Sequence, residues 1–183
     1  MTKNYAGIGA RTTPPDICEI LTSVAANLQD FGWTLRTGGA QGADLAFFQG
    51  ISDLDFVEIS IPWEGFQGFT SQDKPVTNLN AMAPSLKSAA FALAEEHHPN
   101  WEALSEGGQS LMARNSLQIF GLDLETPVDC VICWTPKGEI VGGTGQALRM
   151  AKAHDIPVIN LGSLTLEEAE TIIAGLLEEE SPF

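Results

Sequence analysis

The chain has 183 residues, of which 44% are apolar, and this is enough for one domain with a hydrophobic core. Its formal net charge of −15 argues against a nucleic-acid backbone as the main partner, because such binding needs a basic face. No apolar run is long enough to span a membrane, and the N-terminus lacks the apolar segment of a signal peptide. We therefore expect a cytoplasmic protein without a membrane partner.

Strands and helices are predicted to alternate along the chain. Apolar runs predict five strands, at residues 5–9, 33–37, 56–61, 128–134 and 157–161. Apolar residues at helical spacing predict helices at residues 14–31, 43–50, 84–97, 108–120 and 145–154 and from 165 onward. Thr13 and Thr165 are the expected N-caps of the first and last helix, and residues 63–80 are expected to be irregular. The pattern predicts α/β: a single doubly wound, Rossmann-like domain over 1–183, with a mainly parallel sheet of about five strands.

Three glycine-rich segments follow predicted strands, at 7–11 (GIGAR), 37–44 (TGGAQGAD) and 142–146 (GGTGQ). A glycine-rich turn before a helix exposes backbone N–H groups that bind an anion, usually a phosphate. In a doubly wound sheet, such turns meet at the carboxyl ends of the strands. The alternative is that all three are only tight turns. The predicted ligand-binding glycines are Gly9, Gly38, Gly39, Gly42, Gly142, Gly143 and Gly145.

Several side chains near these segments are candidates for contact with a ligand. Arg11 is placed to hold a phosphate through two parallel hydrogen bonds, or to form an ordinary surface ion pair. The hydroxyl of Thr144 is a further donor to a phosphate, or simply an N-cap. Trp63 either stacks on a base or covers the core.

Two carboxylates are the catalytic candidates. Asp44 lies in the first turn of a predicted helix, where it serves as a cap or contacts the ligand. Glu64 lies between Trp63 and Phe66, where apolar surroundings would raise its pKa as a general acid requires. An ordinary solvated glutamate is the alternative for Glu64.

No cofactor and no metal site is predicted. Cys130 and Cys133 form a C-x-x-C motif, but inside an apolar strand, so buried structural thiols are expected. His97 and His98 end a predicted helix without further metal ligands at a suitable spacing. The apolar runs at 89–93 and 172–177 are either core or the face of a homodimer.

The motifs YAGIGAR (5–11), TGGAQGAD (37–44), MARN (112–115) and GGTG (142–145) resemble the SLOG superfamily. This superfamily includes the "lonely guy" phosphoribohydrolases, the DprA DNA-processing proteins and sensors of nucleotide signals. The resemblance extends from Tyr5 to Leu161, and it implies a Rossmann-like fold that binds a nucleotide or a nucleotide derivative. By the same resemblance, Arg114 matches an arginine of the phosphoribohydrolases, with Asn115 beside it.

The sequence departs from the phosphoribohydrolase motif P-G-G-x-G-T-x-x-E. Val141 takes the place of the proline, Gln146 that of the threonine and Arg149 that of the glutamate. By this resemblance, the sequence retains the glycines of the phosphate-binding loop but lacks the catalytic glutamate of the phosphoribohydrolases.

Three classes of function remain open at this point. The first is an enzyme that cleaves the N-glycosidic bond of a nucleotide, with Asp44 or Glu64 assisting. The second is a sensor or sequestering protein that binds a nucleotide-like small molecule without turnover. The third is a DprA-like DNA-binding protein, against which the acidic composition counts.

Overall fold

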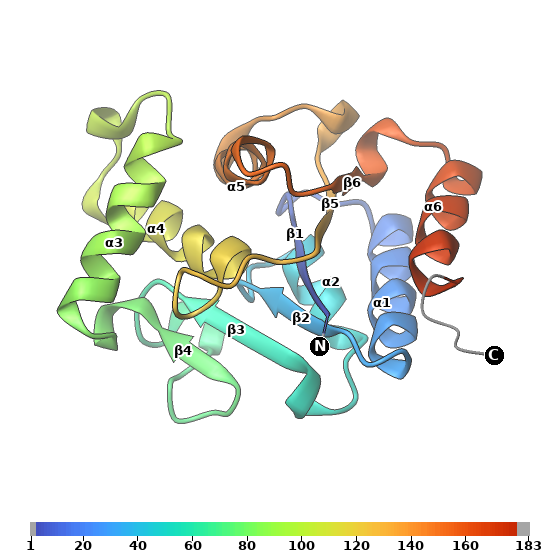
Figure 1. Ribbon diagram of the computed structural model, residues 1–183, viewed down its shortest axis with the longest axis horizontal. Coiled ribbons are helices and arrows are strands. Elements are labelled where there is room, and N and C mark those ends of the chain that lie inside the picture. Colours follow the sequence, from blue (N-terminus) through green and yellow to red (C-terminus); the bar gives the residue numbers. More distant parts are fainter. Residues whose placement is uncertain (1–2, 179–183) are drawn as a thin grey trace.

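The computed structural model describes residues 3–178, which form a six-stranded, entirely parallel sheet flanked by helices (Figure 1). The strand order is β4-β3-β2-β1-β5-β6. The strands are β1 (Asn4–Gly9), β2 (Thr34–Thr37), β3 (Val57–Ile61), β4 (Val76–Asn78), β5 (Cys130–Trp134) and β6 (Val158–Asn160). The helices are α1 (Pro15–Asp30), α2 (Ala43–Gln49), α3 (Pro84–Glu96), α4 (Glu106–Phe120), α5 (Gly142–Ala153) and α6 (Leu166–Glu178).

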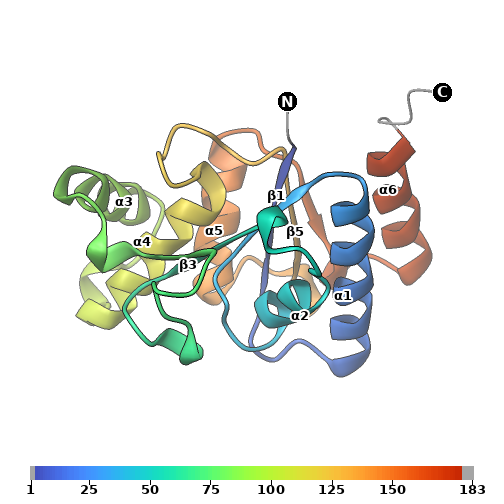
Figure 2. The same ribbon diagram turned by 90° about the horizontal axis from the view of Figure 1, so that it is seen from below.

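Helices cover both faces of the sheet, as Figure 2 shows from its edge. Helices α1, α2 and α6 pack on one face, α4 and α5 on the other, and α3 packs against α4. Successive strand residues enter opposite layers of core: Tyr5 packs under α1 and α2, whereas Ala6 packs under α4 and α5. This arrangement confirms the predicted doubly wound α/β fold.

The sheet has one strand more than the sequence indicated. Strand β4 lies inside the 63–80 segment that was expected to be irregular, and it pairs only with β3. Three residues, Val76, Thr77 and Asn78, are too few to show a periodic pattern. Strand β4 therefore forms because it pairs with β3, and not because of a local sequence pattern.

The helix starts agree only in part with the predicted caps. At α6, Thr165 and Glu168 form the predicted reciprocal cap, with Glu168 Oε2 accepting from the Thr165 backbone N–H at 2.8 Å. At α1, the prediction for Thr13 is wrong: Pro14 is the N-cap, and the Thr13 hydroxyl donates to the carbonyl oxygen of Ala10 at 2.6 Å. Since the prolines of the first turn donate no N–H, this helix start needs less capping.

Cys130 and Cys133 are free and buried, as predicted, and burial raises the pKa of each thiol to about 12. No helix within residues 3–178 combines the length and the apolar character needed to cross a membrane. Over the same residues, no cluster of three or more His, Cys, Asp or Glu side chains is placed to hold a metal ion.

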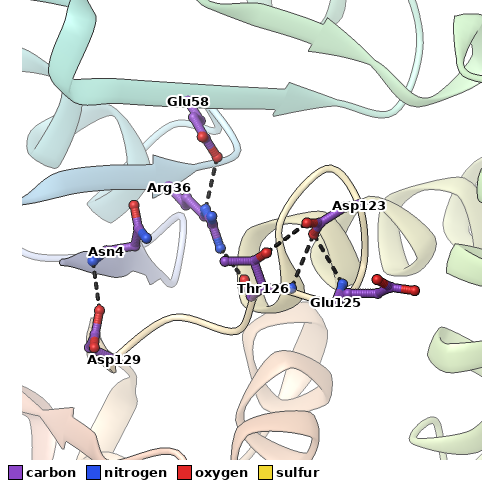
Figure 3. A network of polar contacts seen from close by, with 7 residues as sticks. All are labelled: Asn4, Arg36, Glu58, Asp123, Glu125, Thr126 and Asp129. Carbon is purple, nitrogen blue, oxygen red and sulfur yellow. Dashed lines mark hydrogen bonds and ion pairs between the residues drawn. The ribbon is translucent and has the colours of Figure 1, made fainter. Parts of the chain in front are cut away.

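A buried arginine fixes the connection between α4 and β5 to the sheet (Figure 3). Arg36 on β2 donates from Nε to Glu58 Oε2 at 2.8 Å and from Nη1 to the carbonyl oxygen of Thr126 at 2.6 Å. The backbone N–H of Asn4 also donates to Asp129 Oδ2 at 2.8 Å. These contacts hold the entry to β5 against β1 and β2.

Asp123 orders the same connection and generates a pH-dependent prediction. Its carboxylate accepts from the Thr126 hydroxyl at 2.6 Å and from the backbone N–H of Glu125, and these bonds lower its pKa. A lowered carboxyl pKa stabilises the fold above the ordinary value of 3.8, and this contribution is lost as the pH falls through the folded value. We expect Asp123→Ala to lower the free energy of unfolding by about 1 kcal/mol at pH 7, and by less near pH 3.

Urea unfolding at both pH values measures this difference, with Asp55→Ala as the control, since Asp55 is exposed, has no positive φ, and its carboxylate accepts no hydrogen bond among the described residues. An equal loss at pH 3 and pH 7 would contradict the assignment of the effect to the ionised carboxylate.

Candidate functional site

A cavity of about 360 Å³ opens at the carboxyl ends of β1, β2 and β5. The strand order reverses between β1 and β5, which is where doubly wound sheets bind their ligands. The cavity lies between the loop after β1, the loop after β2, helix α4 and the start of α5. The three glycine-rich segments therefore meet at one edge of the sheet, as the sequence predicted. The predicted site residues that line the cavity are Gly9, Arg11, Asp44, Arg114, Asn115, Gly142, Gly143 and Thr144.

The glycines of the second segment make room for other parts of the protein. A Cβ on Gly38 would stand 1.4 Å from Arg114 Nη1, and one on Gly39 would stand 2.6 Å from the ring of Phe69. Gly42 has a φ of +84°, and the carbonyl oxygen of Ala10 lies 2.4 Å from where its Cβ would be. These three glycines do not line the cavity, so internal packing accounts for them.

Gly145 belongs with that group, because its Cβ would stand 2.8 Å from the backbone of Ile140. Gly142 and Gly143 are different and face the cavity. Gly142 has a φ of +63° and no atom within 4 Å of where its Cβ would be, and at Gly143 only the flexible end of Met112 approaches, at 3.2 Å. At these two positions the backbone is open to a ligand.

The first turn of α5 presents unpaired backbone donors to this cavity. The helix begins at Gly142, ahead of the predicted start at Gly145, and its N-cap is Val141, which makes no side-chain cap. Thr144 is therefore inside the helix, and the alternative that it is the N-cap is wrong. The N–H of Gly145 bonds to the Val141 carbonyl, whereas those of residues 142–144 make no hydrogen bond to the part of the chain that the structure describes.

Asp44 is buried at the base of the cavity, where it joins two loops. Its Oδ1 accepts from the N–H of Gly9 at 3.2 Å, and its Oδ2 accepts from the N–H of Gly38 at 3.1 Å. Burial raises the pKa of Asp44, while Arg114 and these backbone N–H groups oppose that rise. The carboxylate therefore first organises the loops after β1 and β2.

Arg114 projects from α4 into the same region and is also buried. Its Nη1 donates to the carbonyl oxygen of Ser60 at 3.2 Å and lies 4.0 Å from Asp44 Oδ2, and its guanidinium lies over the ring of Phe66. Its Nε is buried without a partner among the described residues. Burial lowers the pKa of Arg114 and the carboxylate of Asp44 raises it, so the two groups compensate each other's charge.

Asn115 connects α4 to the start of α5. Its Nδ2 donates to the carbonyl oxygen of Gly143 at 3.1 Å and to Gln146 Oε1 at 3.0 Å. Gln146 is itself buried and donates to the carbonyl oxygen of Ala94. Gln146 therefore positions Asn115 and the glycines. Arg149, in the place of the family's glutamate, donates instead to the carbonyl oxygen of His97, away from the cavity.

Arg11 is exposed at the mouth of the cavity and makes no hydrogen bond or ion pair with the described residues. It is therefore a cation available to an entering anion. Trp63 and Glu64 do not line this cavity. Trp63 packs edge-on against Phe66, at 5.4 Å between ring centroids.

The expectation of a raised pKa for Glu64 is wrong. Glu64 is exposed and accepts from the hydroxyl and the backbone N–H of Ser71, and these bonds lower its pKa. Asn78 on β4 donates to it as well. Its neighbours in sequence are aromatic, but its neighbours in space are polar, and those determine the pKa.

Two polar side chains that line the cavity were not predicted from the sequence. Gln118 lies one helical turn after Arg114, on the same face of α4, and Thr135 directly follows β5. The signal for Gln118 was its spacing from Arg114, and that for Thr135 was its place at a strand's carboxyl end.

Comparison with known proteins gives one likeness of fold. No protein-family model matches the chain, and no curated protein matches its sequence. Among solved structures, the chain is similar to DNA processing protein A from Helicobacter pylori, described for its single-stranded DNA binding mode. The TM-score is 0.59 with 18% identity, over 98% of this chain and 82% of that one.

The chain has the fold of DNA processing protein A. That protein is one of the group to which the motifs were compared, and the likeness confirms the predicted Rossmann-like fold. At 18% identity, the similarity shows a shared fold but does not identify the ligand of this chain.

The contact between Gly38 and Arg114 generates a prediction. Gly38→Ala should lower the free energy of unfolding by about 1–3 kcal/mol, because the new methyl group would displace a buried guanidinium. The matched control is Gly175→Ala in α6, where no atom lies within 4 Å of the new Cβ and where alanine favours the helix. Urea unfolding of both variants measures this, and equal stabilities would show that Arg114 does not need the space.

Proposed function

We propose that the chain binds a small phosphorylated molecule of the nucleotide class in this cavity and holds it without cleaving it. The observation that carries the proposal is the first turn of α5, whose N–H groups at residues 142–144 are unpaired and face the cavity. A helix N-terminus with free donors binds a phosphate through hydrogen bonds and through its dipole. Arg11 adds a charged donor at the same mouth.

The size of the cavity supports a single small ligand. Its volume of about 360 Å³ is near the lower end of the roughly 300–1,000 Å³ found for ligand sites. A mononucleotide or a part of one is of suitable size, whereas a dinucleotide cofactor is too large.

The placement of the carboxylates favours binding over hydrolysis. Of the residues that line the cavity, Asp44 is the sole acid, and its two oxygens already accept from Gly9 and Gly38. Glu64 lies elsewhere, with a lowered pKa. A general acid or base must reach the reacting group, and no further carboxylate in the described part of the chain is placed to do so. A sensor or sequestering protein therefore fits better than a glycosidase.

DNA binding is the second candidate, and the structural likeness favours it, because DNA processing protein A binds single-stranded DNA. The net charge of −15 counts against it, since affinity for a nucleic-acid backbone comes from neutralising phosphates with Lys and Arg. Retardation of a labelled single-stranded oligonucleotide at low salt, lost at about 200 mM salt, would establish this second function.

Gly143→Val tests the phosphate site. Gly143 does not have a positive φ, and its Cβ would meet only the end of Met112, so we expect the variant to fold. Its side chain would block the approach of an anion and should weaken binding of nucleoside monophosphates by more than about tenfold. Isothermal titration calorimetry measures this, with Gly107→Val in the first turn of α4 as the control. Equal affinity of the Gly143 variant and the parent would refute the phosphate site.

Arg11→Gln tests the cation at the mouth. Arg11 has no partner among the described residues, so its replacement should leave the stability of the fold within about 0.5 kcal/mol of the parent. Because it loses a charge-assisted hydrogen bond, the variant should bind nucleoside monophosphates about tenfold more weakly and with less dependence on salt. An unchanged affinity would place the phosphate away from Arg11.

The absence of turnover is tested separately. Incubation of the parent protein with a panel of nucleoside monophosphates, followed by chromatography, should release no free base while calorimetry shows binding. Release of free base by the parent protein, abolished in Asp44→Asn, would assign hydrolysis to Asp44 and overturn the proposal of binding alone.

A further inference from the structure

The floor of the cavity carries polar side chains beside the apolar Ile8, Ala40 and Ala147, and the polar groups determine which part of a ligand can form hydrogen bonds there. Five polar lining side chains are each more than nine-tenths buried: Asp44, Arg114, Asn115, Gln118 and Thr135. The exposed lining residues include Arg11, Val141 and Gly142, at the mouth. A ligand's polar part therefore has buried partners beyond the phosphate site.

The floor offers both donors and acceptors. Gln118 Nε2 is a donor without a partner in the described chain, and Thr135 Oγ1 accepts from Asn160 Nδ2 at 2.7 Å, which leaves its hydrogen free to donate. Both amide hydrogens of Asn115 are used, so its Oδ1 remains an acceptor. A hydroxyl group, which donates and accepts at once, matches such a mixture.

The charges around the cavity determine where the phosphate and the hydroxyl groups of a ligand bind. Asp44 and Arg114 lie 4.0 Å apart and compensate each other, so the floor carries no net charge. A phosphate there would meet the carboxylate of Asp44, whereas at the mouth it meets Arg11 and the N-terminus of α5. The favourable orientation places the phosphate at the mouth and neutral hydroxyl groups on the floor.

None of the described residues that line the cavity is aromatic. Trp63, the residue that could stack on a base, lies outside it. In proteins that bind single-stranded nucleic acids, stacking on an aromatic ring is worth about 1–3 kcal/mol per base. The described residues of this cavity do not offer that contribution to a base.

We propose that the cavity recognises a pentose phosphate through its sugar hydroxyl groups and its phosphate, and that an attached base adds little affinity. This inference rests on the proposed function and names the part of the ligand that the protein recognises. Gln118 and Thr135 bind the sugar and determine specificity for it, while Arg11 and residues 142–144 hold the phosphate.

The test is calorimetry on the parent protein with ribose 5-phosphate, 2-deoxyribose 5-phosphate, inorganic phosphate and the four common nucleoside monophosphates. We expect ribose 5-phosphate to bind at least as tightly as each nucleotide, with the four nucleotides within about threefold of one another. The deoxy sugar and inorganic phosphate should each bind about tenfold more weakly or worse, since they lack one or all of the hydroxyl groups.

The outcomes separate the two proposals. Two outcomes would contradict recognition of the sugar without contradicting the phosphate site. One is that nucleotides bind more than tenfold tighter than ribose 5-phosphate, and the other is that inorganic phosphate binds as tightly as the sugar phosphate. If no phosphorylated ligand binds, the proposed function itself fails, and this inference fails with it.

Two variants locate the sugar site on the protein. Gln118→Met and Thr135→Val keep the side-chain volume, and each should reduce the preference for ribose 5-phosphate over inorganic phosphate, a ratio that a general loss of stability does not change. Glu64→Gln, outside the cavity, is the control and should leave the ratio as in the parent. An unchanged ratio in both cavity variants would place the sugar elsewhere and contradict the proposal.

Discussion

The site depends on one buried carboxylate. Asp44 sits at the start of α2 and accepts backbone N–H groups from the end of β1 and from the turn after β2, and it faces a guanidinium from α4. Three separate parts of the chain are thereby held around the carboxylate of Asp44. Because a buried carboxylate is costly unless it is paired and hydrogen-bonded, this arrangement is specific: each partner must be present for the others to be satisfied.

The partner of Asp44 explains the glycines around it. Arg114 reaches the carboxylate through the space that a side chain on Gly38 would fill, and Phe69 uses the space beside Gly39. A glycine-rich segment that resembles a ligand loop is in this case largely a packing device. Among the glycines of the second and third segments, those that line the cavity are Gly142 and Gly143, which meet no backbone, at the point where α5 begins without a side-chain cap.

The electrostatics of the cavity are local and do not follow the net charge. The chain is strongly acidic, yet the mouth of the cavity holds Arg11 and a helix N-terminus, and the floor holds a compensated ion pair. An acidic protein of this kind repels polyanions over long distances, while one small anion still finds complementary partners at close range. DNA processing protein A, which has the same fold, is described for its binding of single-stranded DNA, and a shared fold does not by itself fix the ligand.

The sequence by itself determined the class of fold, the edge of the sheet that carries the site and the cap at Thr165, because these follow from short-range periodicity and from local backbone chemistry. It did not determine strand β4, whose three residues have meaning only beside β3. Nor did it determine the low pKa of Glu64, which depends on Ser71 and Asn78, or the role of Gly38, which depends on Arg114. Tertiary structure decided these features, because each rests on contacts between residues that only folding brings together.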